Sequence, residues 1–321
     1  MSLSSDAVVE RRYLRRRVTF WRVATALIAI IAIIVGASRF AGRLGDDQAA
    51  HIARVRITGL ILDDADFTRM LDRLAKSNAK AVLLEVDSPG GGAAASEELY
   101  AHLRKVGEKR PIVAVDGSLA ASGGYMVSLA ADRIFARNSS AIGSIGVIFQ
   151  IPNVTQLLGT VGVKMEIVKS SPLKASPNPF ETTPPEATAA IAALVGDTFA
   201  WFKDLVRERR RLDEAALAKV ADGRIFAGPQ ALTLKLIDGI GGEDEALAWL
   251  KSDKGIDTDL PIRNWTAERR GWLQRLTGEA MMGALSELGL ADASKILSAA
   301  SGPMRTQVAS GLLAMWQPMG E

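Results

Sequence analysis

Short apolar runs alternate with amphipathic helical patterns along the middle of this chain, and this alternation restricts its fold more than any other feature. In chain order, the strands and helices indicated in this way are 52–57, 64–77, 81–87, 96–109 and 112–116. Because strands that alternate with helices pair in parallel, the pattern predicts an α/β domain with a largely parallel sheet and covering helices. Further along, residues 133–136 and 164–169 fit strands, and residues 185–211 fit a long helix.

A single serine stands among small residues in the segment Leu119–Tyr125, just after the strand predicted at 112–116. An apolar helical pattern begins at Gly123, so Ser122 lies at a strand-to-helix turn. There its hydroxyl would point into a crevice, and the Gly123 amide could donate to a developing negative charge. The segment alone favours a plainer reading, because a serine before a helix usually caps a free N–H.

A nucleophilic serine needs a base, and histidine is scarce in this chain. His51 lies near the N-terminus, His102 lies in a charged helical pattern, and no histidine follows Ser122, so a Ser–His–carboxylate triad lacks candidates. A desolvated lysine amine can also accept a proton. Lys174 lies in a proline-broken loop, although most loop lysines are solvated and its position alone indicates little.

Three consecutive glycines, 90–92, follow the apolar run at 81–86. Their bare backbone amides suit an extended peptide or an oxyanion, whereas a flexible turn into the next helix would need one glycine. A phosphate-binding loop is not indicated, since neither the Gly-x-x-x-x-Gly-Lys-Ser/Thr nor the Gly-x-Gly-x-x-Gly pattern occurs here.

With these features together, the chain resembles the signal peptide peptidases of the SppA type, in their short single-unit form. The resemblance covers about residues 51–250 and rests on Asp87–Gly92, Ala120–Tyr125, Ile142–Val147 and Lys174, which occur in that order. It implies a fold of the Clp protease/crotonase-like class.

The resemblance also implies a serine–lysine dyad. Ser122 would be the nucleophile and Lys174 the general base, while Ser144 would hydrogen-bond the lysine amine and orient it. The amides of Gly91 and Gly123 would form the oxyanion hole, with Gly90 as the alternative to Gly91. No cofactor or metal is implied.

The substrates implied by the resemblance are remnant signal peptides and other apolar peptides. Family members assemble as rings or domes, so a homo-oligomer is expected in which a neighbouring protomer can supply the lysine.

The uncharged run at 23–38, extended by flanking arginines and aromatics, predicts a transmembrane anchor at 21–41. Arginines crowd the preceding segment, so the positive-inside rule places residues 1–20 in the cytoplasm. The catalytic domain would then face the periplasm from a bacterial-type inner membrane. A cleaved signal peptide is the competing interpretation.

The expected domains are the peptidase domain at 46–250 and a helical C-terminal extension at 251–321. The chain has no cysteine, which excludes disulfides and cysteine-based metal sites. Its net charge of +3 comes mostly from the arginine-rich N-terminus and indicates membrane topology rather than nucleic-acid binding.

Two other classes of function stay open from the sequence. An enoyl-CoA hydratase-like enzyme would use glycine amides for a thioester oxyanion, but needs acidic residues rather than a Ser–Lys pair. A non-catalytic anchored scaffold would use Ser122 only as a helix cap, and Lys174 would then be replaceable without effect.

Overall fold

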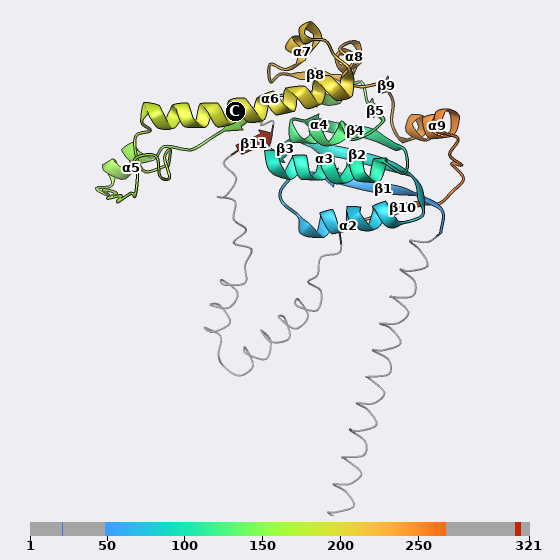
Figure 1. The fold of residues 1–321 in the computed structure, drawn as a ribbon, viewed down its shortest axis with the longest axis horizontal. Coiled ribbons are helices and arrows are strands. Elements are labelled where there is room, and N and C mark those ends of the chain that lie inside the picture. Colours follow the sequence, from blue (N-terminus) through green and yellow to red (C-terminus); the bar gives the residue numbers. More distant parts are fainter. Residues whose placement is uncertain (1–20, 22–48, 268–311, 316–321) are drawn as a thin grey trace, which may run out of the picture. The chain divides into compact units, whose positions relative to one another are not determined.

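The computed structural model describes Trp21, residues 49–267 and residues 312–315 (Figure 1). The chain divides into two compact units, Met1–Ala49 and Ala50–Glu321, and the fold described below belongs to the second. Apart from Trp21, the anchor predicted at 21–41 and the basic segment at 1–20 lie outside the described residues. Within the described part of the chain, no helix combines the length and apolar character needed to cross a membrane.

A parallel sheet forms the centre of the second unit (Figure 1). Its strands follow the spatial order β10–β1–β2–β4–β5–β9, and each neighbouring pair in this order is parallel, which confirms the predicted sheet. Their bounds are His51–Thr58 for β1, Ala79–Ser88 for β2, Ile112–Ala121 for β4, Arg133–Ala136 for β5, Gly239–Ile240 for β9 and Ile262–Trp265 for β10.

Further strands continue the pairing beside Ser122. Strand β6, Ala141–Gly143, runs parallel to the end of β4, and β8, Ile225–Ala227, pairs antiparallel with β6. A separate small sheet has the order β3–β11–β7, with β3 at Gly90–Gly92, β7 at Ile148–Phe149 and β11 at Leu312–Met315.

Helices cover the two faces of the parallel sheet because alternate strand residues point to opposite sides. Val82 and Leu84 of β2 pack in a core with residues of α2, α3, α4 and α6, whereas Leu83 packs in a second core with Trp249 and Leu250 of α9. The helices are α2 Ala65–Lys76, α3 Ala93–Gly107, α4 Gly123–Ser128, α5 Thr155–Thr160, α6 Pro185–Arg210, α7 Glu214–Val220, α8 Gly228–Thr233 and α9 Glu243–Lys254.

The predicted N-terminus of α2 is confirmed at the atomic level. The Asp64 carboxylate accepts from the backbone N–H of Asp66 at 3.0 Å and of Phe67 at 3.1 Å, which satisfies two N–H groups that the first turn leaves free. The helices predicted at 96–109 and 185–211 correspond to α3 and α6 within a few residues.

Two expectations about elements differ from the structure. The strand predicted at 164–169 is wrong, because that segment has no regular structure. Its apolar residues Met165, Ile167 and Val168 are exposed. An apolar sequence pattern forms a strand only where another strand lies beside it to pair with its backbone. The extension predicted as helical from 251 onward includes strand β10, which completes the sheet beside β1, and strand β11; residues 268–311 lie outside the described residues.

Candidate active site

Ser122 occupies the turn between β4 and α4 in a strained backbone conformation. Its φ is 53° and its ψ is −118°, a region that a residue with a Cβ rarely adopts. Two hydrogen bonds hold it there: Ser122 N donates to Gly143 O at 2.7 Å, and Met126 N donates to Ser122 O at 2.9 Å. Such strain costs roughly 1–3 kcal/mol and persists where the surrounding structure enforces it, typically at functional sites.

The Ser122 side chain is not used as a helix cap. It makes no capping hydrogen bond to α4, and its Oγ donates to Gly146 O at the long distance of 3.5 Å. The residue is 1% exposed. The structure therefore argues against the capping interpretation that the local sequence favoured.

Gly123 and Gly124 bring the first turn of α4 against the end of β2. A Cβ at Gly124 would lie 2.6 Å from the carbonyl oxygen of Ser88, so this approach requires glycine. Gly123 is the first residue of α4, where a backbone N–H has no acceptor within the helix. That N–H is thus positioned next to Ser122 as a donor.

One edge of the glycine strand β3 forms backbone hydrogen bonds with Ile61, and the other edge faces away from Ile61. Ile61 N donates to Gly90 O at 2.8 Å, and Gly92 N donates to Ile61 O at 2.9 Å. A Cβ at Gly91 would lie 1.9 Å from the Ile61 carbonyl oxygen, which excludes any side chain there. Because neighbouring residues of a strand present their backbone groups to opposite edges, the N–H and C=O of Gly91 face away from Ile61.

Ser144 lies beside Ser122 at the end of the adjacent strand. β4 and β6 pair in parallel with Ala121 opposite Gly143, so the residue after each strand is a serine. Ser144 is buried, has a φ of 50°, and donates its N–H to Arg224 O at 2.8 Å. Helix α4 also contacts β3, so Ser122, Ser144, Gly123 and the glycine strand are brought together.

Lys174 is not brought to this group within the chain. It is exposed and lies in the segment between α5 and α6, which is set well apart from α4 in Figure 1. Its side chain lines a mostly apolar cavity of about 520 Å³, together with Met165, Ile167, Val168 and Phe180. Among the described residues, no hydrogen bond or ion pair links Lys174 to Ser122 or Ser144.

One buried acid near the site was missed by the sequence analysis. Asp116 of β4 is fully buried, and Ser128 Oγ of α4 donates to its Oδ1 at 2.6 Å. Its Oδ2 has no hydrogen-bond partner among the described residues. Burial raises the pKa of Asp116 to about 7, while the Ser128 hydroxyl opposes that rise. A lone aspartate at the end of the apolar run 112–116 was the available signal.

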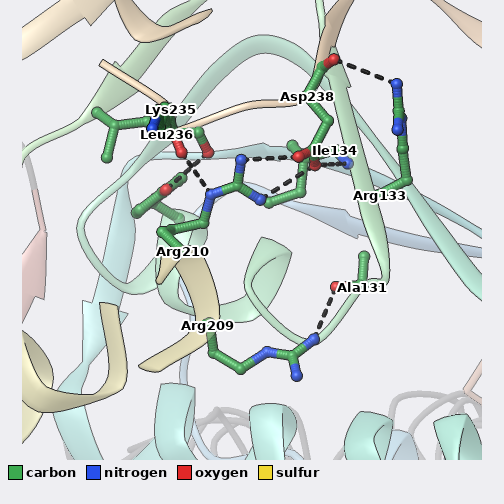
Figure 2. Close-up of polar contacts among 9 residues, drawn as sticks. Ala131, Arg133, Ile134, Arg209, Arg210, Lys235, Leu236 and Asp238 are labelled. Atoms are coloured by element: carbon green, nitrogen blue, oxygen red, sulfur yellow. Dashed lines mark hydrogen bonds and ion pairs between the residues drawn. The ribbon is translucent and has the colours of Figure 1, made fainter. Parts of the chain in front are cut away.

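A second polar cluster attaches the C-terminal end of α6 to the core (Figure 2). Arg210 forms two hydrogen bonds to the Asp238 carboxylate, at 3.0 and 2.9 Å, and that carboxylate also accepts from Ile134 N at 2.8 Å. Arg209 donates to the carbonyls of Leu129 and Ala131 just after α4, at 2.8 and 2.9 Å. The long helix is therefore fixed to the loop between α4 and β5.

Comparisons with known proteins show what this chain is similar to. The model of the family described as peptidase family S49 matches residues 104–257, a range that includes Ser122, Ser144 and Lys174 but begins after Gly91. A Synechocystis protein with the provisional name of protease is 33% identical over 248 residues, covering 76% of this chain and 90% of that protein.

Two further relatives carry more specific names. A protein of Enterococcus faecium, provisionally named signal peptide peptidase SppA, is 30% identical over 302 residues, covering 84% of this chain and 88% of the relative. Protease 4 of Salmonella typhi is 32% identical over 215 residues, covering 63% of this chain and 34% of that longer protein.

Proposed function

The chain belongs to peptidase family S49 and is a serine-type peptidase, and we propose that Ser122 is its nucleophile and Lys174 its general base. One observation carries the choice of Ser122: a buried serine held at positive φ between a strand and a helix, with its hydroxyl unused for capping. We further propose that the domain shares the Clp protease/crotonase-like architecture.

In the proposed mechanism, the neutral amine of Lys174 removes the Ser122 proton as Oγ attacks a peptide carbonyl. The N–H groups of Gly91 and Gly123 stabilise the oxyanion, and Ser144 orients the lysine amine. The leaving amine takes a proton from Lys174. Water, deprotonated by the same lysine, then hydrolyses the acyl-enzyme and frees Ser122.

The lysine in this proposal comes from a neighbouring protomer of a homo-oligomer. The segment 155–184 that carries Lys174, here named the lysine arm, extends from the core and exposes large apolar side chains (Figure 1). These include Leu157, Val161, Val163, Met165, Ile167, Val168, Leu173 and Phe180. An apolar surface of this kind is typical of a protein–protein interface, and a second copy presenting its Ser122 would cover it.

The proposed substrates are remnant signal peptides and other apolar peptides, met at the membrane surface. The apolar run at 23–38 and the arginines before it support an anchor with the catalytic domain on the periplasmic side of a bacterial-type inner membrane. A peptidase held there would meet apolar peptides as they leave the bilayer.

The test is hydrolysis of a quenched fluorescent apolar peptide by the full-length chain in detergent. Ser122→Ala and Lys174→Ala should each lower kcat/KM by about 1000-fold or more, since a nucleophile and its base act as one unit. Lys164→Ala, an exposed lysine on the same arm, is the matched control and should keep the wild-type rate. Full activity in either site variant would remove that residue from the mechanism, and no turnover by correctly assembled wild type would favour the scaffold interpretation.

Mixing the two inactive variants tests the sharing of the dyad. A mixed assembly contains sites that combine an intact Ser122 with an intact Lys174 of the neighbour, so part of the activity should return. If mixtures stay inactive under conditions where labelled protomers exchange, the lysine acts within its own chain and that part of the proposal fails.

A further inference from the structure

A chain of polar contacts within the lysine arm ends at the residue after Lys174. Lys169 pairs with the Glu181 carboxylate, and both side chains are mostly buried. The same Glu181 oxygen, Oε1, accepts from Asn178 Nδ2 at 2.7 Å, and Asn178 Nδ2 also donates to Ala175 O at 2.9 Å. Glu181 therefore connects the ammonium group of Lys169 to the backbone beside Lys174.

The backbone around Lys174 has a shape that needs such support. Lys174 N donates to Ser171 O at 3.1 Å, which closes a turn at residues 171–174, here named the lysine turn. Ala175 follows it with a φ of 54°, a left-handed conformation that is unfavourable for a residue with a Cβ. The bond from Asn178 holds the carbonyl of Ala175, and so constrains the turn from which Lys174 projects.

Both Glu181 and Asn178 are themselves held in place. Asn153 Nδ2, just before α5, donates to Glu181 O at 3.2 Å, which ties the backbone of Glu181 to the beginning of the arm. Asn178 Oδ1 accepts from Phe180 N at 2.9 Å, so both polar atoms of the Asn178 amide are used. The contacts from Glu181 to the lysine turn therefore start from a fixed point.

Two lysines line the cavity of the arm, and Glu181 distinguishes them. Lys169 and Lys174 both contribute to its wall. The hydrogen bond from Lys169 lowers the pKa of Glu181, so this carboxylate is charged at neutral pH. Lys174 makes no ion pair with any residue that the structure describes. A lysine engaged by a carboxylate is not free to take a proton from serine, whereas an unpaired lysine is.

We propose that Glu181 is a positioning residue for the general base. Through Asn178 it holds the lysine turn in the shape that directs Lys174 toward the Ser122 hydroxyl, and through its ion pair it keeps Lys169 out of the reaction. Glu181 then acts on the reaction only through Lys174. The inference rests on the proposed function of Lys174.

The experiment measures kcat and KM for the quenched apolar peptide with the full-length protein in detergent. Glu181→Ala should lower kcat by about tenfold or more, because a small displacement of the base is costly in the reacting complex. KM should stay within about twofold, since substrate binding does not use Glu181. Glu166→Ala removes an exposed carboxylate from the same arm and is the matched control, with wild-type kcat expected.

Stability and assembly are measured in the same variants. The buried residues of the two cores lie outside the arm, so Tm and the size by light scattering should match the wild type in Glu181→Ala and Glu166→Ala. A loss of assembly that accounts for the lost kcat of Glu181→Ala would assign Glu181 a purely structural role and overturn the proposal.

A double-mutant cycle tests the route through Asn178. Asn178→Ala alone should lower kcat, and the variant that combines it with Glu181→Ala should be no slower than Glu181→Ala, because both changes break the same chain of contacts. Additive losses would show that the two residues act separately and would overturn the proposal.

The remaining outcomes separate this inference from the proposed function. Wild-type kcat in Glu181→Ala, with Lys174→Ala inactive, overturns the positioning role and leaves the proposed base standing. A raised KM with unchanged kcat in Glu181→Ala assigns this residue to peptide binding and also overturns it. Full activity in Lys174→Ala removes the proposed base, and this inference with it.

Discussion

Ser122 and Asp116 lie on the same strand-to-helix unit, and each departs from ordinary behaviour because of its surroundings. Ser122 holds a positive φ because backbone hydrogen bonds to Gly143 and Met126 enforce it. Asp116 holds a carboxyl group where one oxygen meets Ser128 and the other meets no partner among the described residues. The strained backbone of Ser122 is typical of a catalytic residue. The buried carboxyl of Asp116 makes the stability of the fold depend on pH.

The Asp116 carboxyl should lower stability as pH rises. Its pKa in the folded chain, about 7, lies above the ordinary 3.8, so the folded state binds this proton more tightly than the unfolded state. Its contribution is complete below about pH 4 and is lost as pH rises through about 7, a decline of up to about 4 kcal/mol in the free energy of unfolding.

Asp116→Asn should remove this decline, because the amide resembles the protonated acid and does not titrate. Urea unfolding at about pH 5 and pH 8 measures the difference between variant and wild type. Asp259→Asn, at an exposed position, is the control and should leave the decline in place. Equal pH dependence in wild type and Asp116→Asn would show that Asp116 does not titrate in this range.

The secondary-structure elements around the site are held by different means. Helix α4 is buried along its whole length and strand β4 along most of it, whereas α6 is attached mainly near its C-terminal end, through Phe202, Leu205 and the arginine cluster. Its N-terminal half, next to the lysine arm, is largely exposed. In that half of α6 only Ala187 is buried, so few buried side chains hold the end of the helix that adjoins the lysine arm.

Arg210→Ala should lower the free energy of unfolding by about 3 kcal/mol, because it leaves the Asp238 carboxylate partly buried without its cation. Arg207→Ala, three residues earlier on α6, removes an exposed ion pair with Glu214 and should cost less than about 1 kcal/mol. Chemical unfolding of both variants compares the two. An equal decrease in the free energy of unfolding in both variants would show that the Arg210–Asp238 pair stabilises the fold no more than an exposed ion pair does.

Within the described residues of the second unit, the residues of the proposed site lie in two places, the packed core and the lysine arm. The core holds Ser122, Ser144 and the glycine strand together, while Lys174 lies on an arm with exposed apolar side chains. A single copy presents the two halves of the proposed dyad apart. Assembly of several copies is the proposed way in which they meet.

Val168→Asp should weaken assembly and activity together. Val168 is fully exposed on the lysine arm, so the charge should not disturb the core, but burying it at an interface between copies would be costly. We expect smaller species by light scattering, peptide hydrolysis reduced at least about tenfold, and an unchanged Tm. Leu232→Asp, at an exposed apolar position on α8, is the control. Wild-type assembly in Val168→Asp would contradict an interface at this position.

The order of residues was enough to predict the parallel sheet, its covering helices, the Asp64 cap and the turn at Ser122. These features arise from apolar periodicity and from side chains within a few positions of each other, so a local pattern carries them. The roles of Ser122, Lys174, Ser144, Gly91 and Gly123, taken from resemblance, stay predictions.

Contacts between distant segments were decided by the tertiary structure alone. Four features depend on which segments meet in space. They are the pairing of β11 with Gly91, the burial of Asp116, the joining of β10 to β1 and the separation of the segment between α5 and α6 from α4. No local pattern encodes them, because a short strand or a lone charged residue takes its environment from the neighbours that the whole fold provides.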